Sequence, residues 1–139
     1  MKELIDSLTS DLPLEKASVI FLAGLPMGMA YNPSVNIVVE SLPGVFTLEE
    51  VVEAEIESIK LVVKDYNLYE KTKVIVGDKG AIILEWEGSV ANLGLSRLMQ
   101  MVVVEGKVTW TVTCTTTPEQ FPALKEVFIQ IVKSFRVLG

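Results

Sequence analysis

Residues 95–135 read LSRLMQMVVVEGKVTWTVTCTTTPEQFPALKEVFIQIVKSF, and this stretch decides the fold. From residue 108 onward, apolar and threonine side chains alternate strictly, which is the period of a half-buried β-strand. The apolar face consists of Val108, Trp110, Val112 and Cys114, and the other face of Thr109, Thr111, Thr113 and Thr115. Glu105 and Gly106 supply a tight turn to a preceding strand over 95–105. The stretch therefore begins with a predicted β-hairpin.

An amphipathic helix is predicted after this hairpin. Thr117 stands where an N-cap belongs, Pro118 follows at the first helical position, and Gln120 stands at the third, a combination that favours helix initiation. Apolar residues then recur at three- and four-residue spacing, on the side opposite the charged residues. They are Phe121, Leu124, Phe128, Ile131, Val132 and Phe135. A helix with one apolar face of this kind is expected to pack on the sheet.

The rest of the chain predicts a second helix and further strands. Thr47 and Glu50 form a capping box that opens a helix over 47–66, and the acidic residues of this helix precede its lysines, in the order that the helix dipole favours. A short helix is expected over 2–12, within a lead-in segment of residues 1–16. Further strands are expected over 17–22, 36–41, 68–76 and 81–87. The gaps in the later strand run are too short for helical crossovers, so the pairing is antiparallel.

These elements predict one α+β domain over residues 1–139. Helices cover an antiparallel sheet of five to seven strands. At 139 residues, half of them hydrophobic, the chain is long enough for one sizeable core. No internal repeat, low-complexity segment or linker divides the sequence.

The composition argues against several classes of function. The net charge is −6 and no basic run occurs, which disfavours binding to nucleic acid or to anionic membrane surfaces. The chain has no histidine, so the commonest general base and the commonest metal ligand are missing, and no cofactor or metal is expected. Cys114 lies on the inward face of its strand and is interpreted as a buried, inert thiol.

Two carboxylates remain as the candidates for acid and base chemistry. Glu85 and Glu87 flank Trp86 and stand about 7 Å apart along one strand face. Such a pair could serve catalysis if both side chains were buried with raised pKa values. Strand alternation instead predicts that both face solvent, and we therefore expect a protein that is not an enzyme.

The compartment is open. The apolar stretch at 17–30 is interrupted by Gly24, Pro26 and Gly28 and is too short to span a membrane, and the segment before it is biased toward negative charge. As written, the sequence is expected to be cytoplasmic. An envelope location is expected instead if the true start lies upstream.

Five stretches in order carry a resemblance to a known family: NIVVESLP at 36–43, TLEE at 47–50, VGDKGAIILEW at 76–86, MQMVVVEGKVTWTVTC at 99–114 and FIQIVKSF at 128–135. With them the chain resembles the PsbP-like/DcrB-like superfamily. The resemblance implies an αβα sandwich and a family of mostly non-catalytic binding proteins. Its members include the extrinsic photosystem II subunit, a regulator that binds the GTPase Ran, bacterial envelope lipoproteins and chaperones for type VI secretion effectors. Envelope members usually carry a lipid-attachment cysteine near the N-terminus, and here no cysteine precedes Cys114.

Methionine is the other candidate for function, because it adapts to irregular apolar partners. Two groups of residues are candidate binding residues: Leu25, Met27, Met29 and Tyr31 in a loop over 23–31, and Met99 and Met101 on one face of a strand. The loop either lies on the surface and meets a partner or folds over the sheet to complete the core, and the sequence leaves both open.

The leading hypothesis is a non-enzymatic binding or adaptor protein. It recognises a polypeptide partner through its sheet face and the 23–31 loop, and the same surface could serve a homodimer. The alternative is a carrier of a small hydrophobic ligand, held between sheet and helix around Trp86, Met99 and Met101. That alternative requires an enclosed apolar cavity of about 300 Å³ or more.

Overall fold

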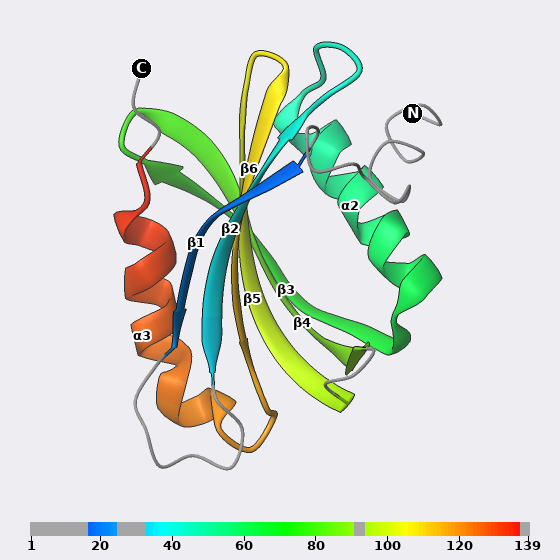
Figure 1. Cartoon of the computed structure of the whole chain (residues 1–139), viewed down its shortest axis with the longest axis vertical. Coiled ribbons are helices and arrows are strands. Elements are labelled where there is room, and N and C mark those ends of the chain that lie inside the picture. The colour runs from blue at the N-terminus through cyan, green and yellow to red at the C-terminus, as the bar shows by residue number, and fades with distance from the viewer. Residues whose placement is uncertain (1–16, 25–32, 91–93, 137–139) are drawn as a thin grey trace.

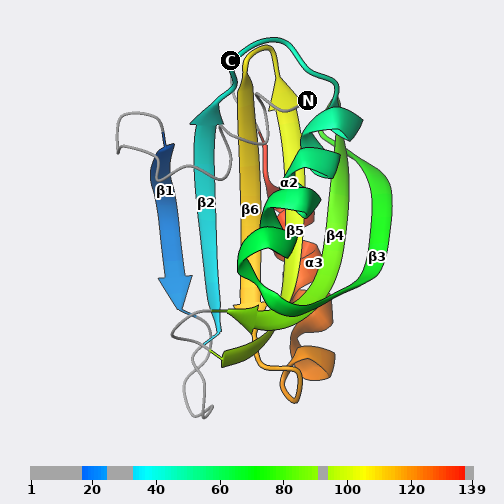
Figure 2. The same ribbon diagram turned by 90° about the vertical axis from the view of Figure 1, so that its right-hand side faces the viewer.

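The computed structural model describes residues 33–90 and 94–136, together with the backbone of residues 17–24. In this part of the chain, six antiparallel strands form one sheet in the order β1-β2-β6-β5-β4-β3. One helix covers each side of the sheet, α2 on one face and α3 on the other (Figure 1, Figure 2). The predicted α+β class and αβα layering are therefore confirmed.

The element bounds agree closely with the periodicity of the sequence. The strands and helices are β1 (Ala17–Gly24), β2 (Ser34–Ser41), α2 (Leu48–Val62), β3 (Lys64–Val76), β4 (Lys79–Val90), β5 (Gly94–Glu105), β6 (Val108–Thr116) and α3 (Phe121–Ser134). Strands β3 to β6 follow one another as a meander, and β2 joins β6 on the far side. Gly77 and Gly106 adopt φ values of 66° and 60° at the first position of two hairpin turns, a conformation that glycine reaches without strain.

The start of α2 is as predicted, and its end is not. Thr47 Oγ1 accepts a hydrogen bond from the Glu50 amide at 3.1 Å, and Glu50 Oε1 accepts one from the Thr47 amide at 2.9 Å. The helix ends at Val62 rather than near residue 66, because Val63 is already extended and Asp65 adopts a φ of 57°. Aspartate tolerates this left-handed region better than most residues, so β3 can begin with almost no connecting loop.

The predicted start of α3 is also displaced. Thr117 does cap a turn, since its Oγ1 accepts from the Gln120 amide at 3.3 Å, but the helix itself begins at Phe121. Pro122 stands in the first helical turn and has no N–H to donate to the carbonyl of Pro118. Residues 118–120 therefore form a turn that leads into the helix.

The core has two halves, one on each side of the sheet. Strand β4 shows the division, because Ile82, Leu84 and Trp86 pack under α2 while Ala81 and Ile83 pack under α3. The prediction that β6 is half-buried is wrong, since Thr109, Thr111 and Thr115 on its threonine face are also buried. The central strands lie between the two helices, and alternation in the sequence does not reveal a cover on the second face (Figure 2).

Candidate functional site

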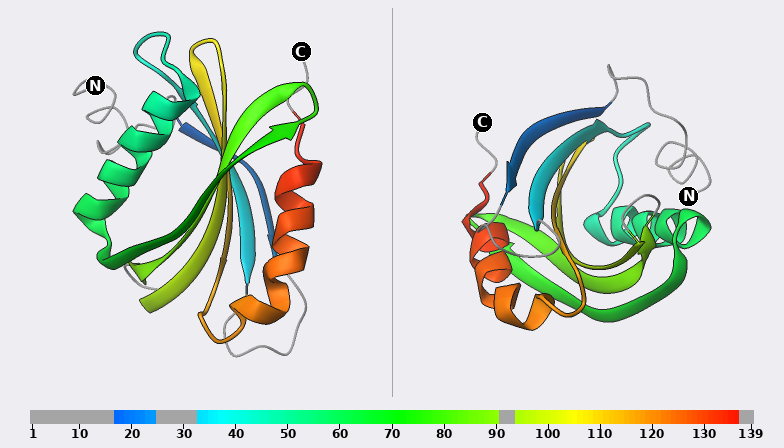
Figure 3. Two further views of the ribbon diagram at one scale, coloured as in Figure 1. Left: turned by 180° about the vertical axis from the view of Figure 1, so that it is seen from behind. Right: turned by 60° about the horizontal axis from the view of Figure 1, so that its bottom comes forward.

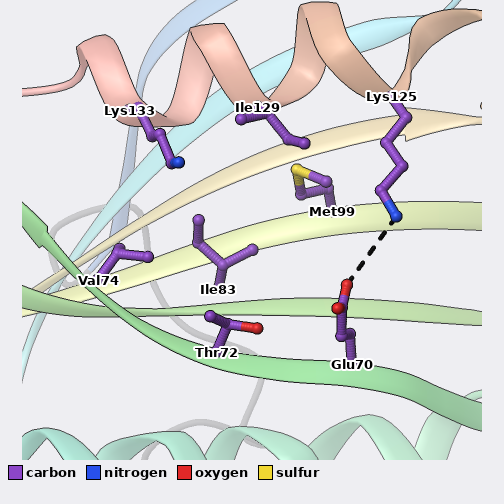
Figure 4. Close-up of a pocket in the computed structure, with 8 residues that line it drawn as sticks. All are labelled: Glu70, Thr72, Val74, Ile83, Met99, Lys125, Ile129 and Lys133. Atoms are coloured by element: carbon purple, nitrogen blue, oxygen red, sulfur yellow. Dashed lines mark ion pairs between the residues drawn. The ribbon is translucent and has the colours of Figure 1, made fainter.

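An open groove of about 240 Å³ lies between the edge strand β3 and α3. Figure 4 shows its lining residues, which come from three strands and one helix: Glu70, Thr72 and Val74 of β3, Ile83 of β4, Met99 of β5, and Lys125, Ile129 and Lys133 of α3. The floor is apolar, and the charged side chains stand at the rim. A groove of this kind is suited to an apolar side chain of a bound molecule, with polar groups beside that side chain meeting the charged rim.

The groove follows from the way the sheet twists beneath α3. The helix packs on β5 and β6, whereas β3 lies at the sheet edge beyond β4. The twist brings the turn between β3 and β4 beside the C-terminal end of α3 (Figure 3). Gly77 in this turn and Arg136 after the helix are so close that a Cβ added to Gly77 would lie only 3.0 Å from Arg136 Cδ. The short side chain of Thr72 leaves space between this strand and the helix.

An ion-pair cluster lies next to the groove and connects two strands to α3. We call Arg97, Glu85, Glu87 and Lys125 the Arg97 cluster. Arg97 Nη2 lies 2.5 Å from Glu85 Oε2, Arg97 Nη1 lies 3.3 Å from Glu87 Oε1, and Lys125 Nζ lies 3.2 Å from Glu85 Oε1. The guanidinium also stacks over the ring of Tyr69, 3.6 Å from its centroid. The two basic side chains of the cluster neutralise the carboxylate of Glu85, a residue that is only 4% exposed.

The prediction that Glu85 and Glu87 both face solvent is therefore wrong for Glu85. Strand β4 is covered on both faces, so a residue on its α3 side is buried even though the sequence alternates. Glu87 keeps 21% of its side-chain exposure. The condition for carboxylate catalysis, burial of both side chains, is not met, and both carboxylates are engaged by Arg97.

The structure separates the candidate residues Trp86, Met99 and Met101. Met99 lines the groove, and Met101 is fully buried beneath α3. Trp86 lies on the opposite face, under α2, where its Nε1 donates to Gln100 Oε1 at 2.7 Å. The predicted grouping of the three residues in one ligand site is wrong. Trp86 pairs with Leu98 and shares its face of the sheet, whereas Met99, the next residue along β5, points to the other face.

The remaining four candidate binding residues lie outside the part of the chain that the structure describes. They are Leu25, Met27, Met29 and Tyr31, and their role in binding stays a prediction.

Cys114 is fully buried, as predicted. Burial raises the pKa of its thiol to about 12, so the thiol is unreactive at neutral pH.

Several groove residues were not identified from the sequence. No sequence pattern marks them as candidate binding residues: Thr72, Val74, Lys125, Ile129 and Lys133. The polar run from Glu70 to Lys73 was the available signal, because charged side chains at most positions of a strand are typical of a sheet edge.

The α2 side of the sheet holds a second pair of carboxylates. Glu55 of α2 is partly buried, and this burial, together with the nearby charge of Glu40 on β2, raises the pKa of Glu55 to about 7. Burial likewise raises the pKa of Glu40. The folded protein therefore holds these protons more tightly than the unfolded chain does.

Replacing Glu55 with glutamine should remove a pH-dependent penalty. Because the folded pKa is raised from 4.5 to about 7, stability falls as the pH rises through this interval and stays low above it. At pH 8 the variant should be more stable by about 2 kcal/mol, since one pKa unit corresponds to about 1.4 kcal/mol and partial exposure reduces the full effect. Urea unfolding at pH 4 and pH 8 measures this. At pH 4 the two proteins should be equal, and the exposed control Glu57→Gln should show no such change. A gain that is equal at both pH values would contradict the assignment.

The described residues contain neither a candidate metal site nor a membrane-spanning helix. Among them, no three histidine, cysteine, aspartate or glutamate side chains come together as a metal site. None of the helices in that same part of the chain combines the length and apolar character needed to cross a bilayer.

Known protein families and curated proteins gave no sequence match to this chain. Solved structures do match. PA94 of Pseudomonas aeruginosa, a protein of unknown function proposed to be a regulator, has 15% identity and a TM-score of 0.72, with 88% of this chain and 84% of that chain covered. Cyanobacterial PsbP of Synechocystis sp. PCC 6803 has 10% identity and a TM-score of 0.58, with 93% and 96% covered. LpqN of Mycobacterium tuberculosis, involved in cell envelope biogenesis, has 14% identity and a TM-score of 0.57, with 84% and 75% covered. The chain therefore has the PsbP-like fold, as its sequence resemblance predicted.

Proposed function

We propose that the protein is a non-enzymatic binding protein that holds a polypeptide partner in the groove between β3 and α3. The observation that carries this proposal is the open groove with an apolar floor formed by Val74, Ile83, Met99 and Ile129. Grooves of this kind accept one or two apolar side chains of a larger partner, while the rim lysines meet its polar groups.

The size of the groove favours a polypeptide over a small ligand. Pockets for small molecules enclose about 300–1,000 Å³ and bury most of the ligand. Here the volume is about 240 Å³ and the groove is open to solvent. A hydrophobic carrier would need a deeper and more closed site, so we place this alternative second.

The central strands of the sheet are unsuitable for docking. Both faces of β4 and β5 are covered by helices, so a partner cannot reach the sheet face that the sequence suggested. The edge at β3 is accessible instead, because most of its side chains are exposed. The 23–31 loop is still a candidate for a second contact.

The absence of enzymatic activity is supported by two observations. The sequence has no histidine, and the buried carboxylate of Glu85 is held by Arg97 and Lys125. The names of the similar structures agree with this proposal, since they include a proposed regulator, a cyanobacterial PsbP and a protein involved in cell envelope biogenesis. The last of these supports an envelope location, and a cytoplasmic location is the alternative.

Filling the groove should abolish binding without unfolding the protein. Thr72→Trp places a large ring in the groove from an exposed strand position, and aromatic residues are favoured in strands. The control is Val45→Trp, because Val45 is 75% exposed and lies between β2 and α2, outside the groove and the β3 edge. Tagged protein is used to capture partners from lysate of the source organism, with quantitative mass spectrometry. Thr72→Trp should reduce the main partner at least tenfold, whereas Val45→Trp should retain it.

Thermal unfolding is measured for both variants, and we expect midpoints close to that of the wild type. The proposal is contradicted if the wild type captures no protein above background. It is also contradicted if Thr72→Trp captures the same proteins in the same amounts as the control.

A further inference from the structure

Strand β3 forms one edge of the sheet that the described strands build. It has 13 residues, and among the described strands it pairs only with β4. The pairing is irregular between Lys64 and Asn67 and between Leu68 and Glu70, but it runs without a shift from Glu70 to Val76. A regularly paired stretch of seven residues is long enough to accept a further strand through main-chain hydrogen bonds.

The register of the hairpin shows which backbone groups are open. The turn at Gly77 and Asp78 makes Val76 and Lys79 the closing pair. In an antiparallel pair, alternate residues direct their N–H and C=O groups to the neighbouring strand. Counting back from the turn, Val74 and Thr72 face β4, whereas Ile75, Lys73 and Lys71 face the open edge.

The two sides of this edge differ in chemistry. Thr72 and Val74 line the groove under α3, and Lys71 and Lys73 lie on the α2 side. Lys71 Nζ lies 2.6 Å from Glu53 Oε1, and Lys73 Nζ lies 2.5 Å from Glu49 Oε1. These ion pairs are exposed to solvent and therefore weak, so carboxylates of an added strand could share or replace them.

A second copy of this chain is a poor occupant of the edge. In a two-fold antiparallel pair centred on Lys71 or Lys73, that lysine meets its own copy. Centring the pair on Thr72 places Lys71 opposite Lys73. Like charges directly opposite one another destabilise a sheet, so these central registers disfavour self-pairing.

We infer that a partner segment adds to β3 as a further strand. The segment is extended and alternates between acidic side chains, which lie opposite Lys71 and Lys73, and apolar side chains, which lie over the groove. This inference rests on the proposed function and names the chemistry of the partner at the same site. Main-chain hydrogen bonds supply affinity, while the groove and the two lysines supply specificity.

The test uses a phage-displayed library of random dodecapeptides, selected on the immobilised chain of 139 residues. The enriched peptides should alternate acidic and apolar residues. Lys73→Pro removes an N–H at the open edge, where proline is tolerated in strands, and Lys73→Ala keeps that N–H while losing the same charge. Fluorescence anisotropy of the enriched peptides should show at least a tenfold weaker Kd for the proline variant than for the alanine variant.

Three results would overturn strand addition: no enrichment, enriched peptides without the alternation, or equal affinity for the proline and alanine variants. Circular dichroism checks the fold of Lys73→Pro. If that variant is unfolded, Ile75→Pro removes another outward N–H nearer the strand end and is compared with Ile75→Ala. Peptides that bind the proline variant as tightly as the alanine variant, but do not bind Thr72→Trp, would overturn strand addition and leave the groove as the binding site. Peptides that bind the proline variant and Thr72→Trp with unchanged affinity would overturn both proposals.

Discussion

Replacing Arg97 with methionine should lower the free energy of unfolding by about 3 kcal/mol, because it leaves a buried carboxylate with less compensation. Arg97 is the main partner of Glu85, whose side chain is 6% exposed. Methionine keeps much of the apolar contact with Tyr69, so the loss reports mainly the missing charge. Lys125 remains beside Glu85, and we therefore expect a value at the lower end of the range for broken buried pairs. Urea unfolding at neutral pH measures the change.

Two further variants control for other causes of the loss. Lys60→Met breaks the exposed pair with Glu57 and should cost less than about 1 kcal/mol. The double variant Arg97→Met with Glu85→Met removes both charges, and it should recover most of the stability, because two apolar side chains need no compensation. A loss for Arg97→Met as small as that for Lys60→Met would show that the cluster is not a buried pair.

Replacing Phe128 with alanine should cost about 4 kcal/mol, the usual size for a phenylalanine removed from a core. Phe128 is fully buried beneath α3, and its ring lies edge-on to Phe121 with centroids 6.1 Å apart. Its neighbours belong to the core on the α3 side, including Met101 and Val112. The loss combines the transfer of the ring to water with the cavity left behind. Chemical denaturation of both proteins measures it.

The control for this prediction is the preceding residue on the same helix. Val127 is 39% exposed, and Val127→Ala should change stability by only about 0.5 kcal/mol. Equal losses at positions 127 and 128 would mean that α3 does not pack on the sheet with the face assigned here.

Local sequence signals predicted most of the fold. The alternation from Val108 to Thr115, the glycine at position 106 and the capping box at Thr47 each depend on neighbours within a few residues, and each is seen in the structure. The end of α2 and the start of α3 were misplaced, since both depend on backbone details at Asp65 and Pro122 that periodicity does not report.

Contacts between distant residues could not be predicted in this way. Glu85 and Arg97 stand on neighbouring strands, and their contact depends on the register of β4 against β5. The same register directs Trp86 and Met99 to opposite faces of the sheet, so the ligand site predicted around both residues does not form. A hydrophobic pattern shows that a strand has a buried face, but it does not show that a second helix covers the other face.

The groove was beyond sequence reasoning for a similar reason. Its walls come from β3 and from α3, which lie about fifty residues apart in the chain, at Thr72 and Lys125. Neither residue type is unusual for its element. The groove exists because the sheet twists and α3 packs on β5 and β6, and both are properties of the assembled fold.

Amide hydrogen exchange over the whole chain, with and without the partner captured by the wild type, tests the central claim most directly. The account predicts that exchange slows at the outward amides of Lys71, Lys73 and Ile75 and along the groove side of α3, around Ile129. Amides of β2, on the far part of the sheet, should be unchanged. Slowed exchange confined to residues 23–31 or to β2, with β3 unaffected, would contradict the assignment of the binding site to the groove.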